Sequence, residues 1–179
     1  MVEPAIGFRP ALQFFWTRGE IMDISKKLEK SEGFGEIFSL VKKSVDDVIQ
    51  RRRDGLMLAL QYLPENIGAY YGLGSNFIVM NKSLLEKVAA YQDKSTLKSY
   101  IYYILMHEYL HSLGFLNEAL VHELSYKICK QILGEEHAST QIARRGIASV
   151  IPIDPRPKRQ PEEIEIVEHF ETESISYIG

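Results

Sequence analysis

The chain has 179 residues, of which 45% are hydrophobic and 25% charged, and its formal net charge is −3. These proportions are typical of a globular domain with a core, and the lack of a basic excess argues against a nucleic-acid partner. The single cysteine, Cys129, excludes an internal disulfide and a zinc site built from several thiolates.

Polar residues interrupt the hydrophobic stretches throughout the chain, so we expect no membrane span. Pro4, Arg9 and Pro10 break up the N-terminal region, which argues against a cleaved signal peptide. We therefore expect an intracellular, cytoplasmic protein. Nothing in the sequence indicates an oligomeric state.

Composition divides the chain into three parts. Residues 1–36 contain a dense apolar cluster at 11–16 and are expected to pack on the core as an N-terminal segment. Residues 37–150 carry regular hydrophobic periodicity and are expected to form the main domain. Residues 151–179 begin with a proline-rich stretch, which predicts an extended linker, and continue as an acidic tail that is either a late strand or disordered.

The first half of the main domain alternates between helix and strand patterns. Hydrophobic residues at three- and four-residue steps predict a helix over residues 37–53, whose terminal arginines suit a helix C-terminus. A short apolar run at 55–63 predicts a buried strand. A glycine-rich turn at 68–75 precedes a second predicted strand at 76–81 and a helix over 82–91.

The second half of the main domain is predicted to be helical. Residues 95–113 are apolar on nearly all sides, which predicts a buried helix with Ser95 as its N-cap. Asn117 is expected to cap a helix over 118–133, and residues 138–150 predict a last helix.

The buried helix ends on the motif His107-Glu108-Tyr109-Leu110-His111. His107 and His111 are four residues apart, so they share a helix face and can bind one metal ion. Glu108 points about a quarter-turn away, where it can act on a water molecule instead of the metal. This H-E-x-x-H spacing is typical of zinc peptidases and predicts Zn²⁺ as the cofactor, with Glu108 as general base. The alternative is a pair of core histidines in a hydrogen-bond network.

The motif and the elements around it resemble the zincin metallopeptidases over about residues 37–133. The resemblance implies an α+β fold, in which the edge strand of a small, mostly antiparallel sheet lies beside the buried motif helix and a further helix follows. Residues 77–81 resemble that edge strand. Phe77, Ile78, Val79 and Met80 are therefore expected to bind a peptide substrate, main chain to main chain.

The third metal ligand decides which branch of the zincins the chain resembles. The metzincin branch has a histidine where this chain has Asn117, and a downstream methionine turn, whereas no methionine follows Met106 here. Gluzincins use a glutamate from the next helix, and Glu118 begins that helix, although unusually close to His111 in sequence. The resemblance therefore favours Glu118 and a small gluzincin-like enzyme.

Helix geometry leaves other candidates for the third ligand. A tight hairpin between the two helices brings His122 opposite the motif histidines, alone or together with Glu118, and His137 is a more remote candidate. Glu118 can instead stabilise the N-terminus of its own helix through the helix dipole.

Further roles in the site are assigned by residue type alone. Oxyanion stabilisation has four candidates, which are Tyr70, Tyr71, Tyr103 and His137. Glu123 is a candidate for orienting a histidine ligand.

The sequence thus predicts a zinc-dependent peptidase that hydrolyses a peptide or protein substrate with a metal-activated water and Glu108 as general base. Two alternatives stay open. One is a non-catalytic zincin-like binding or scaffold protein with a structural zinc. The other is a latent peptidase whose C-terminal tail adds a strand to the edge of the cleft and blocks it.

Overall fold

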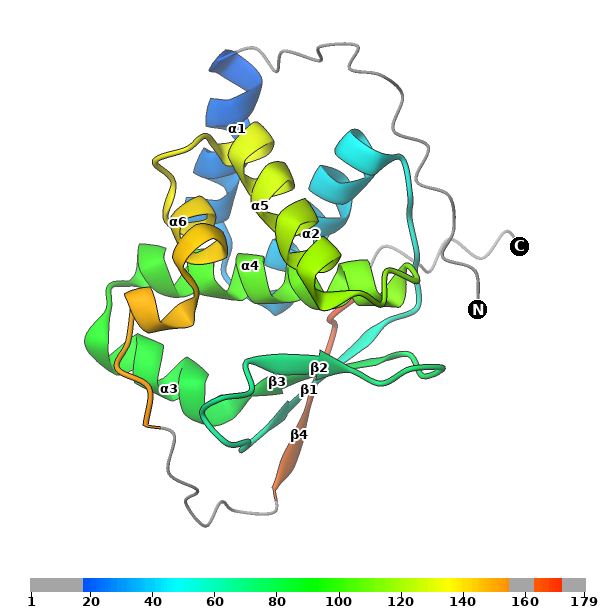
Figure 1. The fold of residues 1–179 in the computed structure, drawn as a ribbon, viewed down its shortest axis with the longest axis vertical. Coiled ribbons are helices and arrows are strands. Elements are labelled where there is room, and N and C mark those ends of the chain that lie inside the picture. Colours follow the sequence, from blue (N-terminus) through cyan, green and yellow to red (C-terminus); the bar gives the residue numbers. More distant parts are fainter. Residues whose placement is uncertain (1–17, 155–162, 172–179) are drawn as a thin grey trace.

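The computed structural model describes residues 18–154 and 163–171, and within these ranges the fold is α+β, with six α-helices and one mixed four-stranded sheet (Figure 1). In chain order the elements are α1 (Arg18–Lys30), α2 (Phe34–Ile49), β1 (Met57–Gln61), β2 (Ala69–Tyr71), β3 (Phe77–Asn81), α3 (Lys82–Tyr91), α4 (Lys94–Ser112), α5 (Glu118–Leu133), α6 (Ala138–Arg145), a 3₁₀ turn (Ile147–Ser149) and β4 (Ile164–Val167). No helix in the described ranges is both long and apolar enough to cross a bilayer.

Helix α4 occupies the centre of the molecule. It lies between a layer of helices (α1, α2, α5 and α6) and the sheet (Figure 1). Residues 99–106 of α4 are all buried, which is the burial expected for a helix that is apolar on nearly all sides. The helix ends on the histidine motif, so the motif lies at one end of the core.

The strands follow the order β2-β3-β1-β4 across the sheet. The central pair, β1 and β3, is parallel, whereas β2 pairs with β3 and β4 pairs with β1 in antiparallel fashion. Leu58 and Leu60 of β1 lie opposite Ile78 and Met80 of β3, and all four side chains are buried. One face of the sheet therefore belongs to the core, against α4 and α3.

The edge strand beside α4 is β2, and the prediction that residues 77–81 form that edge is wrong. Strand β3 lies between β2 and β1 and pairs with both. The main chain of Phe77, Ile78, Val79 and Met80 is therefore already hydrogen-bonded within the sheet and is not available to a peptide. The segment predicted as a glycine-rich turn contains the true edge strand.

The C-terminal strap, residues 163–171, closes the opposite edge of the sheet. Its strand β4 pairs with β1, and Phe170 stacks on Phe38 of α2 with ring centroids 4.3 Å apart. Glu171 forms an ion pair with the buried Lys42, at 3.2 Å, and accepts hydrogen bonds from the main-chain N–H groups of residues 55 and 56. The strap is thus built into the core beside α2.

The position of the strap contradicts the latent-enzyme prediction for the described part of the tail. That prediction places the tail on the edge of the cleft, whereas β4 lies at the far edge of the sheet, with β1 and β3 between it and β2. The proline-rich linker at 155–162 and the last residues, 172–179, lie outside the described residues.

Several helix boundaries follow from local capping. Helices α3 and α5 begin and end where the sequence predicts, and the side chain of Asn117 accepts a hydrogen bond from the N–H of Leu120. The N-cap of α4 is Asp93, not Ser95, because the Asp93 carboxylate accepts from the N–H of Thr96. Helix α2 ends at Ile49 because Gln50 adopts a left-handed conformation, with φ of 53°.

The first and the last helix of the structure differ from the helices predicted from the sequence. Helix α1 was not predicted, yet its Ile24 and Leu28 are buried in the core. The apolar cluster at 11–16 lies outside the described residues. The predicted helix over 138–150 ends at Arg145, because Gly146 has a positive φ and a short 3₁₀ turn follows.

Gly35 offers a test of how tightly the strap is packed. A Cβ at Gly35 would lie 2.8 Å from the carbonyl oxygen of His169 and 3.2 Å from that of Phe170, and both are main-chain atoms of the strap. We expect Gly35→Ala to lower the free energy of unfolding by about 1–3 kcal/mol, because the strap must shift. Urea denaturation measures this change.

Gly33→Ser is the matched control, because nothing lies within 4 Å of a Cβ at Gly33 and serine is a favoured N-cap for α2. It should leave the stability unchanged or raise it. Equal stability of the wild type and Gly35→Ala would contradict the packing of the strap against α2.

Candidate metal centre

A tight connection between α4 and α5 positions the candidate metal ligands. Gly114 has a φ of 94°, a conformation that other residues rarely adopt, and it reverses the chain just after the motif. A ring nitrogen of His111, Nδ1, lies 2.8 Å from the carbonyl oxygen of Phe115, which closes the turn. Asn117 then caps α5, so Glu118 occupies the first turn of that helix. The turn therefore brings Glu118 back over the two histidines.

Three side chains converge on one point at the end of α4. The Nε2 atoms of His107 and His111 are 3.2 Å apart. The two carboxylate oxygens of Glu118 lie 3.2 Å from these nitrogens, Oε2 from His107 and Oε1 from His111. With one ligand atom taken from each residue, the three atoms lie within 4.8 Å of one another.

These distances fit a metal ion with nitrogen and oxygen ligands. Ligand atoms at the zinc–ligand distance of about 2.0–2.1 Å and tetrahedral angles are themselves about 3.3 Å apart. The contact of His111 Nδ1 with a carbonyl oxygen requires the proton on that nitrogen, which leaves Nε2 as a bare acceptor. The unprotonated Nε2 of His111 faces the carboxylate oxygen Oε1 of Glu118 at 3.2 Å, and two such acceptors need a proton or a cation between them. The donor set suits zinc but does not by itself select zinc over other divalent metals.

The environment of His107 favours its neutral, metal-binding form. Burial lowers the pKa of His107, and the neighbouring His111 lowers it further, whereas the carboxylate of Glu118 acts in the opposite direction. A metal ligand must be the unprotonated imidazole. The other nitrogen of His107, Nδ1, is buried and has no hydrogen-bond partner among the described residues.

Glu108 lies beside the three candidate ligands but is not part of their group. Its side chain is buried, and burial raises the pKa of its carboxyl group to about 8, with a further contribution from the charge of Glu118. A hydrogen bond with the main chain of Tyr71 acts in the opposite direction. Glu108 lines the same cleft as the three candidate ligands. A carboxyl group with a pKa near neutrality is suited to proton transfer.

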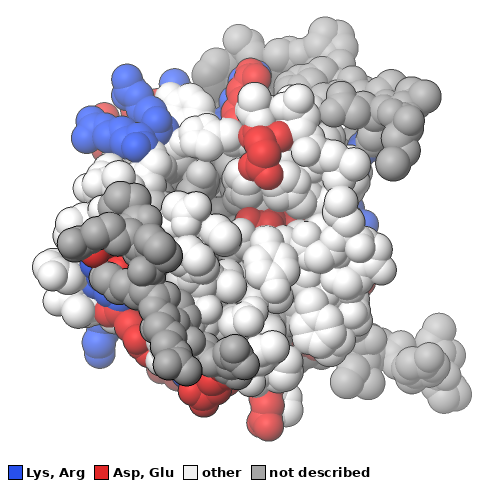
Figure 2. Space-filling model, turned by 60° about the horizontal axis from the view of Figure 1, so that its bottom comes forward, with Lys and Arg blue, Asp and Glu red and all other residues white. Residues whose placement is uncertain are grey.

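The candidate centre opens into a cleft of about 460 Å³ between α4 and β2. Its acidic and histidine lining residues are the three candidate ligands and Glu108, and the other lining side chains are mostly apolar or aromatic, including Ile67, Leu73, Leu116 and Ile147. No lysine or arginine of the described ranges lines it. In Figure 2, which brings the bottom of Figure 1 forward, uncharged residues cover most of the middle of the face, with acidic atoms at a hollow near its centre and charged residues toward the left and lower margins.

The candidates for oxyanion stabilisation fall in different places. Tyr70, Tyr71 and Tyr103 all line the cleft, whereas His137 caps α6 through its Nδ1 and does not. The hydroxyl of Tyr71 is already bonded to Arg53 and to the carbonyl of Ser75. The pKa of Tyr103 is raised by burial and by the nearby carboxylates, so its hydroxyl stays protonated next to the centre. The Tyr103 ring also packs edge-on against His107, with ring centroids 6.2 Å apart, so Tyr103 is in contact with a candidate metal ligand.

Two other predicted residues lie outside the candidate centre. His122 is exposed and does not belong to the group of converging ligand atoms, although its charge acts on His107. Glu123 is exposed and forms an ion pair with Lys127 on the same helix. Neither side chain occupies the position that the sequence allowed for it.

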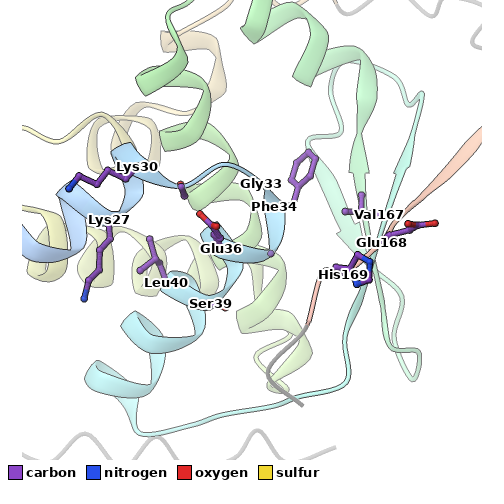
Figure 3. A pocket seen from close by; sticks show the side chains of 12 residues that line it. Lys27, Lys30, Gly33, Phe34, Glu36, Ser39, Leu40, Val167, Glu168 and His169 are labelled. Carbon is purple, nitrogen blue, oxygen red and sulfur yellow. The ribbon is translucent and has the colours of Figure 1, made fainter. Parts of the chain in front are cut away.

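A cavity larger than this cleft lies elsewhere in the molecule. It measures about 780 Å³ and is bounded by α1 and α2 on one side and by the end of β4 on the other (Figure 3). Lys27 and Lys30 stand on the helical side, and Glu168 and His169 on the strap (Figure 3). No group of converging metal-ligating side chains was found there among the described residues. The converging group lies in the smaller cleft.

Comparisons of the chain with protein-family models, with curated proteins and with solved structures find no match. The class of protein defined by the structure is an α+β domain with a candidate metal centre in a cleft.

The buried Glu108 predicts how the stability of the metal-free protein depends on pH. The folded state holds the proton of Glu108 up to about pH 8, whereas the usual carboxyl value is 4.5. Between these values the folded state binds more protons than the unfolded chain, so the free energy of unfolding falls as the pH rises, by up to about 1.4 kcal/mol per pH unit. Glu108→Gln carries no such proton and should escape this fall.

Urea denaturation of both proteins with a chelator present, from pH 5 to pH 8, measures the difference. The advantage of Glu108→Gln over the wild type should grow with pH. Glu123→Gln controls for the loss of a carboxylate elsewhere on the surface. Parallel curves for the wild type and Glu108→Gln would contradict the burial of an ionisable Glu108.

Proposed function

We propose that the protein is a zinc-dependent peptidase of the gluzincin-like type. The proposal rests on one observation, which is the convergence of His107, His111 and Glu118 in a cleft with the carboxyl group of Glu108 beside them. Three protein ligands leave one position of a tetrahedral ion open, as in catalytic zinc sites, whereas structural zinc sites are closed by four. The spacing of the histidines and the position of Glu108 support the same chemistry.

In the proposed reaction, the functional residues of the cleft have separate roles. Bound zinc supplies a Lewis acid that polarises the peptide carbonyl and lowers the pKa of a water molecule to about 7. Glu108 takes a proton from the attacking water and delivers it to the leaving amine. The hydroxyl of Tyr103 is the donor best placed to stabilise negative charge on the carbonyl oxygen. His111 keeps its orientation through the bond between its Nδ1 and Phe115.

The edge strand β2 is proposed to align an extended peptide in the cleft. The main chains of Gly68 and Gly72 are bonded to β3, through Asn81 and Phe77. In an antiparallel pair the direction of the hydrogen bonds alternates, so the main-chain groups of Ala69 and Tyr71 point to the other edge, toward the cleft. The N–H of Tyr71 donates to Glu108, which agrees with this direction, so a peptide would pair with the main-chain groups of Ala69 and with the carbonyl of Tyr71. A substrate strand bound there would be recognised mainly through its main chain.

Metal analysis combined with four variants tests the proposal. We expect the wild type to bind about one zinc per chain and to cleave members of a mixed peptide library. Glu108→Gln should keep the zinc and lose about 10²- to 10⁴-fold in activity, because only the proton transfer is removed. His111→Ala and Glu118→Ala should lose zinc affinity, because each removes a ligand.

His122→Ala is the matched control, since it removes a histidine near the centre that lies outside the converging group. It should keep both zinc and activity. A wild-type protein that takes up no zinc contradicts the metal centre. A protein that binds zinc firmly but cleaves no peptide favours the non-catalytic alternative, with zinc in a structural role.

A further inference from the structure

Arg53 lies in the connection between α2 and β1, and its side chain joins three separate parts of the molecule. Its Nη1 donates to the hydroxyl of Tyr71, at 2.6 Å, and to the carbonyl oxygen of Ser112, at 2.9 Å. Its Nη2 donates to the carbonyl oxygen of Ser75, also at 2.9 Å. The guanidinium thus links the edge strand, the turn after it and the last residue of the motif helix.

The main chain of Arg53 is attached to the same helix. Its N–H donates to the hydroxyl of Tyr109, at 2.8 Å, and that hydroxyl lies 3.1 Å from the Arg53 carbonyl oxygen. Tyr109 is fully buried and packs edge-on against Phe38, so this anchor is fixed in the core. Arg53 is therefore held by the motif helix and reaches from it to the edge strand.

The hydrogen bonds of Arg53 reach residues that line the cleft or directly follow one of its candidate ligands. Tyr71, which receives the guanidinium on its hydroxyl, contacts the carboxyl group of Glu108 through its main chain. Ser112, the second acceptor, directly follows the candidate ligand His111. Arg53 itself is not among the residues that line the cleft.

We propose that Arg53 is a positioning residue that sets the separation between β2 and the last turn of α4, and so holds the main chain of Tyr71 against Glu108. The role of this geometry in peptide hydrolysis rests on the proposed function. The tether between strand and helix does not, and it can be tested in a protein without activity.

The strand needs such a tether because it is weakly held by the sheet. β2 has only three residues and pairs with a single strand, β3. Short edge strands of this kind open readily. A planar guanidinium with several donors in a fixed geometry can hold three acceptors at once, whereas a lysine presents a compact charge on a flexible stem. Arg53→Lys is thus expected to keep the positive charge but not the simultaneous hydrogen bonds to the three acceptors.

Amide hydrogen exchange gives the first test. In Arg53→Met, exchange of the amides in residues 69–75 should accelerate at least tenfold, while β1, β3 and the buried part of α4 keep their protection. Arg52→Met is the matched control. Arg52 is the preceding arginine and carries the same charge, but its side chain is exposed and pairs with Asp54.

Kinetics of the zinc-loaded proteins give the second test. We expect Arg53→Met to retain one zinc and to lose roughly 10- to 100-fold in kcat, because small displacements of a catalytic group have effects of this size. Arg53→Lys should recover the thermal stability lost in Arg53→Met but not kcat. Tyr71→Phe should lower kcat by a similar factor. The double variant Arg53→Met/Tyr71→Phe should have a kcat no lower than that of Arg53→Met, because both changes break the same hydrogen bond between Arg53 and Tyr71.

The outcomes separate the positioning role from the proposed function. Unchanged exchange at residues 69–75 in Arg53→Met overturns the proposal, and so does an acceleration spread evenly over the whole chain. Multiplicative losses in the double variant, or a kcat restored by Arg53→Lys, overturn the catalytic part. A wild type that holds zinc and cleaves nothing contradicts the peptidase, while localised exchange at residues 69–75 still supports the tether.

Discussion

The burial of the middle of α4 on all sides is the constraint on which the rest of the structure depends. Residues 99–106 are covered on every side, and removing such a surface from water stabilises a fold by about 25 cal/mol for each Å². A helix of this kind needs a layer on each side, and here these are the other helices and the sheet (Figure 1). Its polar residues reach water only near its two ends, at residues 94–98 and in the last turns. The last turns are the end that carries the candidate ligands His107 and His111, which remain partly exposed.

Local sequence patterns were sufficient for the elements whose boundaries depend on neighbouring residues. Asn117 caps α5 as predicted, and the full extent of α3 follows from its hydrophobic spacing. The helical position of His107, Glu108 and His111 follows from the apolar run before them. Glu118 was identified by resemblance, and the structure brings it to the two histidines through a turn that Gly114 permits.

The remaining features depend on contacts between distant residues, which the sequence pattern does not contain. Strand β2 is only three residues long and lies between glycines, so pairing with β3 and packing on α4 define it, not its own periodicity. Arg53 follows a helix and was interpreted as a charge at the helix end, but its partners Tyr71 and Ser112 lie 18 and 59 residues further along the chain. Asp93 was missed as a cap because Ser95, two residues later, offered an equally suitable side chain.

The pairing of Lys42 with the strap has a consequence for synthesis of the chain on the ribosome. Lys42, Phe38 and strand β1 emerge long before Glu171 and Phe170, by a delay on the order of ten seconds at typical translation rates. Late in that interval the candidate metal ligands have already been synthesised, but the edge of β1 that β4 later covers has no partner strand. The Phe38 ring likewise lacks Phe170, which later stacks on it. An uncovered strand edge of this kind readily pairs with other chains. The nascent protein is thus most prone to misassembly through this edge just before β4 is translated.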